Sequence, residues 1–137
     1  MLITVRGSTA QLRNWEMMYR QNNLIAGSFQ RVSEGIILQG GHQILNIGTV
    51  LGKNADGIYL PSKKTANDGS QIPCALLADG YDTTNGDVNG VGIYKTGEFN
   101  GNCLIFDDSW TIKELKEALE KEKIFIKTNV VTADDPL

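Results

Sequence analysis

The chain has 137 residues, of which 41% are hydrophobic and 21% charged, and its formal net charge is −3. This composition excludes a disordered or membrane-embedded chain and fits one globular domain with one hydrophobic core. The weak negative charge disfavours nucleic acid as the main partner. Since no apolar run reaches the roughly 18 residues of a membrane span and the first residues lack a signal-peptide pattern, we expect a protein without a membrane partner that stays in the cytoplasm where it is made.

Residues 1–34 differ from the rest of the chain in charge and in pattern. All four arginines lie there, and Glu16 is the only acid among the first 31 residues. The large apolar residues of this part follow neither the period of a strand nor that of a helix. Those expected to be exposed are Trp15, Tyr19, Ile25 and Phe29. We therefore expect residues 1–34 to form a partly flexible arm that orders on a partner, and residues 35–137 to form a compact β-rich domain.

Glycine-rich turns separate short apolar runs in the middle of the chain. Thirteen of the fifteen glycines fall between Gly35 and Gly101. Many short strands divided by turn residues are typical of a small β barrel or sandwich. The predicted strands are Ile36–Leu38, Ile44–Leu45, Thr49–Leu51, Ile58–Leu60, Cys74–Leu77, Val91–Tyr94 and Cys103–Phe106.

The stretch IGTVLGK, residues 47–53, contains the Gly-Lys pair of a phosphate-binding loop but not its spacing. Such a loop needs G-x-x-x-x-G-K-[ST], whereas Gly48 lies one residue too close to Gly52 and Asn54 replaces the hydroxyl residue. A β-hairpin explains the stretch better, because Gly57 can adopt the positive φ of a turn that begins at Asn54.

A helix is predicted over Thr111–Lys123. Thr111 is a suitable N-cap, and Glu114 stands at the reciprocal position of a capping box. Trp110 and Leu115 occupy the two positions of a hydrophobic staple, which would join the preceding chain to the first turn. These signals predict where the helix begins.

Beyond its first turn the predicted helix is amphipathic, with lysines and glutamates around one apolar stripe. Lys123 stands where a glycine would normally end such a helix. Ile124–Ile126 is predicted as a closing strand, and Asp134–Pro136 as a frayed acidic end.

No motif selects a catalytic or metal-binding site. The aspartates of the second half do not have the spacing of a calcium loop, so we expect them to form turns. His42, the only histidine, follows two glycines and is expected in a solvent-facing loop. Cys74 and Cys103 are expected as reduced core residues. We therefore expect a protein that is not an enzyme and needs no metal or cofactor. The alternative is a small hydrolase that uses two carboxylates of the acidic middle zone, residues 35–110, which hold eight acids against four lysines.

Several segments, taken together and in order, resemble the lambda-type head decoration proteins of tailed bacteriophages. The segments are NLIAGSFQRVSEGIIL, IGTVLGK, DGIYLP, TANDGSQIPCALLADGYDTTNGDVNGVGIYKTGEFNGNCLIF and TIKELKEALEKEKIFIK. The resemblance runs from Asn23 to Val131, and its most specific pieces are DGSQIPCALLAD and YKTGEFN.

The resemblance implies a mainly β fold, a β-clip-like small barrel of short strands with one C-terminal amphipathic helix, assembled as a homotrimer. It also implies a structural virion protein on the outer surface of the expanded phage head, which binds the major capsid protein and stabilises the shell against packaged DNA. The segment from Leu24 to Ser33 matches the part that docks on the capsid. The expected capsid-binding residues are Leu24, Ile25, Ala26, Gly27, Phe29 and Arg31. A trimeric tail or fibre module is the alternative within a virion.

Overall fold

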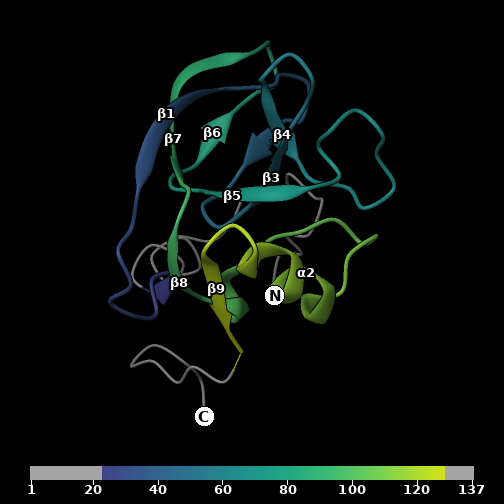
Figure 1. Cartoon of the computed structure of the whole chain (residues 1–137). Coiled ribbons are helices and arrows are strands. Elements are labelled where there is room, and N and C mark those ends of the chain that lie inside the picture. The colour runs from purple at the N-terminus through teal and green to yellow at the C-terminus, as the bar shows by residue number, and fades with distance from the viewer. Residues whose placement is uncertain (1–22, 129–137) are drawn as a thin grey trace, which may run out of the picture.

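The computed structural model describes residues 23–128 of the chain. The predictions for Trp15, Tyr19 and Asp134–Pro136 concern residues that lie outside this part. The described part is mainly β and carries the α-helix α2 (Ile112–Glu120), as Figure 1 shows. The predicted fold class, a small barrel of short strands with a C-terminal amphipathic helix, is therefore confirmed. None of the helices in residues 23–128 is long and apolar enough to cross a membrane.

Five strands close into a small barrel in the order β1-β4-β3-β5-β7. Their bounds are β1 Ser33–Leu38, β3 Val50–Lys53, β4 Tyr59–Pro61, β5 Pro73–Leu77 and β7 Val88–Tyr94. Neighbouring strands are antiparallel, except that β1 and β4 run parallel. Two shorter strands, β2 (Ile44–Leu45) and β6 (Tyr81–Asp82), pair with each other.

Strands β3 and β5 separate two clusters of buried side chains. Leu51, Ala75 and Leu77 face the barrel interior, where they pack with buried residues of β1, β4 and β7. Val50 and Leu76 point to the opposite side and join a second cluster with residues of α2 and its neighbouring strands. Because successive side chains of a strand point to opposite faces, and both faces are buried here, β5 is a continuous apolar run and β3 begins with two consecutive apolar residues, Val50 and Leu51.

The predicted hairpin is confirmed. Leu51 pairs with Pro61 and Lys53 with Tyr59, so β3 and β4 form an antiparallel pair across the expected turn. The Asn54 side-chain oxygen accepts hydrogen bonds from the backbone N–H groups of Asp56 (2.9 Å) and Ile58 (3.0 Å). Gly57 has φ 81, the left-handed conformation for which glycine is suited.

The second buried cluster lies under a layer formed by α2, β8 (Gly97–Asn100) and β9 (Ile124–Lys127), at one end of the molecule (Figure 1). Strands β8 and β9 pair in parallel over their full length. The helix packs on β9 and β5 and buries Leu115 and Leu119 completely. This end of the molecule therefore has its own hydrophobic core, distinct from the barrel interior.

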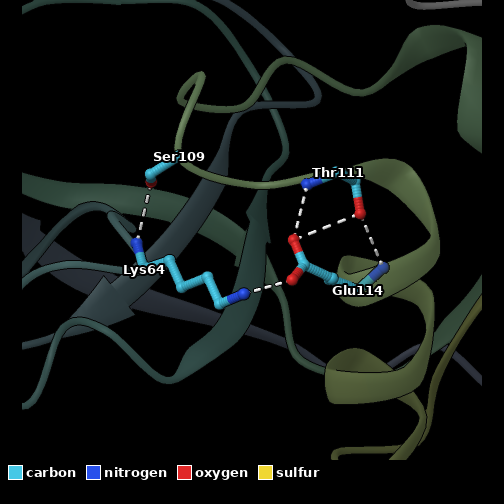
Figure 2. Close-up of polar contacts among 4 residues, drawn as sticks. All are labelled: Lys64, Ser109, Thr111 and Glu114. Carbon is cyan, nitrogen blue, oxygen red and sulfur yellow. Dashed lines mark hydrogen bonds and ion pairs between the residues drawn. The ribbon is translucent and has the colours of Figure 1, made fainter.

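The start of α2 has the predicted capping box, which Figure 2 shows. The Glu114 N–H donates to the Thr111 hydroxyl (3.2 Å), and the Thr111 N–H donates to the Glu114 carboxylate (3.0 Å). Lys64 of the loop after β4 forms an ion pair with the same carboxylate, and its N–H donates to the Ser109 hydroxyl (2.9 Å). These contacts tie the helix start to the barrel. They also lower the pKa of Glu114, with the Lys64 contact as the largest cause.

Three local predictions need correction. Cys103–Phe106 is not a strand, because Asn100 caps a 3-10 turn, η1 (Gly101–Cys103), and only Ile105 forms a bridge, to Thr49. Strands β6 and β8 were not predicted, since neither is an apolar run in the sequence. His42 is half-buried rather than solvent-facing.

Neither Cys74 nor Cys103 forms a disulfide, as expected; Cys103 belongs to the second buried cluster, whereas Cys74 is half-buried at the edge of the barrel core. Burial raises the pKa of the Cys74 thiol. Lys123 has φ 63, so the position where a glycine was expected does adopt the left-handed conformation, with a lysine in it.

Candidate functional site

The segment predicted to dock on a capsid, Leu24 to Ser33, begins along the edge of β8 and ends at the first residue of β1. We call the part before β1, residues 24–32, the docking segment. The Asn100 N–H donates to the Leu24 carbonyl (2.7 Å), and the Ala26 N–H donates to the Glu98 carbonyl (2.9 Å). Ile25 lies opposite Phe99 in an antiparallel bridge. The docking segment therefore starts with an isolated β-bridge on the edge of the β8–β9 pair and is ordered by the protein itself.

The structure divides the six predicted docking residues into buried and exposed ones. Leu24 has 1% of its surface exposed and belongs to the second buried cluster, so its side chain stabilises the fold and is not available to a partner in this conformation. Ile25 (37%) and Phe29 (40%) are large exposed apolar side chains, and Arg31 is also exposed. Ala26 and Gly27 are half-buried.

Further contacts hold the second half of the docking segment. The Val32 N–H donates to the Thr96 hydroxyl (3.0 Å), which in turn donates to the Gln30 carbonyl (2.7 Å). The Phe29 ring packs edge-to-face on Phe125 of β9, with ring centroids 5.0 Å apart. Val32 itself is 44% exposed. The segment thus presents three apolar side chains to solvent, Ile25, Phe29 and Val32, on a backbone that is already hydrogen-bonded.

The carboxylate of Glu98 is the one charged group that binds the backbone of this segment directly among the described contacts. One oxygen accepts a hydrogen bond from the Phe29 N–H (2.7 Å), and the other pairs with Lys127 of β9 (3.2 Å). The hydrogen bond from Phe29 and then the contact with Lys127 lower the pKa of Glu98. Sequence reasoning missed this residue, and no local signal could have found it, because 69 positions separate it from Phe29.

Two cavities elsewhere in the described residues bear on the alternative that the protein is a hydrolase with two catalytic carboxylates. One, of about 310 Å³, is lined by His42, Lys63 and Asp107 among others, and a broader groove of about 580 Å³ is lined by Ile72 and Glu122 among others. Each contains a single carboxylate. Burial and then Lys63 lower the pKa of His42.

The carboxyl groups with clearly shifted pKa values in the described part are all shifted downwards. A general acid would require the opposite shift. Within residues 23–128, no group of three or more His, Cys, Asp or Glu side chains is placed to hold a metal ion. The feature on which the hydrolase alternative depends, a pair of carboxylates with a raised pKa in a pocket, is thus not found in the part that the structure describes.

Comparison with known protein families gives a match over most of the chain. The model of the family described as bacteriophage lambda head decoration protein D matches residues 18–123 of the 137, which is more than half of the chain and includes both the docking segment and Glu98. A search of curated proteins found no match.

Proposed function

The chain belongs to the bacteriophage lambda head decoration protein D family, and we propose from this that it binds the outer surface of the expanded phage head as a homotrimer and stabilises the shell against the pressure of packaged DNA. Membership supports a structural role in decorating the capsid and an association with the phage head. The trimer, the expanded state of the head and the absence of catalysis belong to the proposal. Its partner would be the major capsid protein.

The observation that carries the proposal is the ordered, partly apolar docking segment inside the matched region. Fully burying a side chain such as Ile, Phe or Val stabilises a complex by roughly 1.5–3 kcal/mol. Because about two fifths of each of Ile25, Phe29 and Val32 is exposed, covering all three would contribute roughly 2–4 kcal/mol per segment. Association itself costs at least about 4 kcal/mol, so one segment alone would bind weakly.

A trimer resolves this weakness. Once one docking segment has bound, the second and third bind intramolecularly, which can raise avidity by ~10²–10⁴ without any new kind of contact. The three sites must then match the spacing of the trimer, which would make binding specific for the expanded lattice. Whatever binds the mature shell and not its immature or ruptured form makes the mature shell more stable.

The backbone of the docking segment offers a further contact. The two hydrogen bonds to β8 involve Leu24 and Ala26, so the N–H and carbonyl of Ile25 point away from β8. An extended capsid segment could add there as a strand, with Ile25 beside it. Here residues 24–26 already have their partner on one side, so only their outer edge would take part.

Co-sedimentation with expanded and unexpanded heads of the source phage tests the proposal. The full chain should bind expanded heads only, and sedimentation velocity should show a trimer. Ile25→Ser should weaken binding, whereas Ile37→Ser, a matched control on β1 with similar exposure (41% against 37%), should not. Binding to neither form of head would overturn the proposal and favour a tail or fibre location. Equal loss in both variants would mean that the docking segment is not the contact.

A further inference from the structure

The Glu98 side chain holds residues 26–29, the loop that follows the bridge between Ile25 and Phe99. Its carboxylate accepts the Phe29 N–H at 2.7 Å on one side and pairs with Lys127 at 3.2 Å on the other. The side chain is 24% exposed, so it lies largely between the docking segment and β9. Both oxygens are therefore used, and together they join residues of three separate chain segments.

Gly27 is explained by the same contact. It does not have a positive φ, so the backbone conformation alone would accept another residue. A Cβ at this position would overlap the carboxylate of Glu98 and would come within 3.0 Å of the Glu98 Cβ. A residue with a Cβ at position 27 would therefore push the Glu98 side chain away from the backbone of the docking segment.

We propose that Glu98 is a positioning residue, which holds residues 26–29 in the conformation that presents Phe29 to the capsid. This inference depends on the proposed function, since the capsid is the partner. The position of the Phe29 ring follows from its backbone, and the ring is held against Phe125 only while the loop is fixed. Without the carboxylate the loop through Gly27 samples other conformations, and the fraction of molecules ready to bind falls. The apparent affinity falls in proportion to that fraction.

The first measurement uses the free, full-length protein. Amide hydrogen exchange, followed by NMR, should show faster exchange of the Phe29 amide in Glu98→Ala and in Gly27→Ala, by roughly tenfold or more. The matched control is Glu34→Ala, which removes a comparable exposed ion pair, to Lys95 at 3.3 Å, without touching the docking segment's loop. Exchange of the Phe29 amide should not change in the control.

The second measurement is the affinity for expanded heads. If the loop is ready to bind in about a tenth of the molecules, Glu98→Ala and Gly27→Ala should each bind roughly tenfold more weakly. Glu98→Gln should bind with intermediate affinity, because its amide oxygen can still accept the hydrogen bond but lacks the charge. The variant that carries both alanine substitutions should bind less weakly than the product of the two single effects predicts, since the carboxylate that a Cβ at position 27 would displace is already gone and only the 3.0 Å contact with the Cβ of residue 98 remains.

The two measurements separate the possible failures. Unchanged exchange of the Phe29 amide in Glu98→Ala would overturn the positioning role, whatever the heads show. Faster exchange with unchanged affinity for heads would overturn it as well, because the loop would then be irrelevant to docking. If the wild-type protein does not bind heads at all, the proposed function fails, and with it the role of Glu98 in docking, while the exchange data still show whether the carboxylate holds the loop. Faster exchange together with weaker binding in both single variants, and not in Glu34→Ala, would support the proposal.

Discussion

Replacing Lys123 by glycine should stabilise the protein. Lys123 lies between the end of α2 and β9, and its φ of 63 places an ordinary side chain in the left-handed region. That conformation costs a non-glycine residue roughly 1–2 kcal/mol, because Cβ lies too close to a carbonyl oxygen. Glycine removes this cost, but it also has more freedom in the unfolded chain, which offsets roughly 0.5–1 kcal/mol. The expected net gain in the free energy of unfolding is about 0.5–1 kcal/mol.

Lys121→Gly is the matched control. Lys121 lies two residues earlier, is exposed like Lys123, and has φ −64, in the right-handed helical region. Glycine there adds the same freedom to the unfolded chain but relieves no strain, so it should destabilise by about 0.5–1 kcal/mol. The difference between the two variants isolates the left-handed conformation, and it should be roughly 1–2 kcal/mol in favour of Lys123→Gly.

Urea denaturation, followed by circular dichroism, measures the free energy of unfolding of both variants. The dependence of that free energy on urea concentration should be the same for both, since neither substitution changes the surface exposed on unfolding much. The hydrogen bonds of the turn come from the backbone: the Lys123 N–H donates to Glu120 (3.1 Å), and its carbonyl accepts from Gly97 (3.1 Å). Glycine retains both. If Lys123→Gly lowers stability as much as Lys121→Gly does, the left-handed turn carries no measurable strain and the reasoning is wrong.

Three further predictions concern the helix start, the core and the docking segment. Thr111→Ala removes the side chain of the capping box and should lower the free energy of unfolding by about 1 kcal/mol in a calorimetric melt, and no change would mean that Glu114 alone caps the helix. Leu24→Ala should cost about 2–5 kcal/mol in urea denaturation, whereas Ile25→Ala should cost far less, because only Leu24 is buried; equal costs would contradict that division. The Glu98 carboxyl should titrate below its ordinary pKa of 4.5, so it holds Phe29 at neutral pH and releases it only as the pH falls through the lowered pKa. The chemical shift of the Phe29 amide should follow that titration, and a midpoint at or above 4.5 would refute the contact.

Local signals allowed part of the fold to be predicted from the sequence. The capping box and the β3–β4 hairpin depend on residues only a few positions apart, and each was found where it was predicted. Lys123 stands where a glycine commonly ends a helix, and the structure shows at this position the left-handed conformation that glycine favours, which the lysine had left unpredicted. Chemistry within a turn or a cap is specified almost entirely by neighbouring residues.

The features that could not be predicted from the sequence depend on contacts between residues far apart in the chain. Leu24 and Ile25 are adjacent and similar, and only the pairing with β8 determines which of them is buried. Strand β8 contains Glu98 and Asn100 and is not an apolar run, yet it pairs with β9 on one side and forms the bridge with Ile25 on the other. The carboxylate contact to Phe29 joins positions that no local pattern connects. The sequence therefore predicted the docking segment as a whole. It did not predict which of its side chains face solvent or which contacts hold its backbone.

The end of α2 and the docking segment are connected through β8. The Lys123 carbonyl accepts the Gly97 N–H at the start of β8, and β8 then provides both the backbone partners of residues 24–26 and the Glu98 side chain. Because the order of the docking segment comes from these contacts, the entropy lost in ordering it belongs to folding and does not weaken the binding step. Changes that keep the backbone bond to Gly97, such as Lys123→Gly, should alter stability and leave the affinity for heads unchanged. A change at Glu98, whose side chain is partly exposed and outside the buried clusters, should alter the affinity far more than the stability.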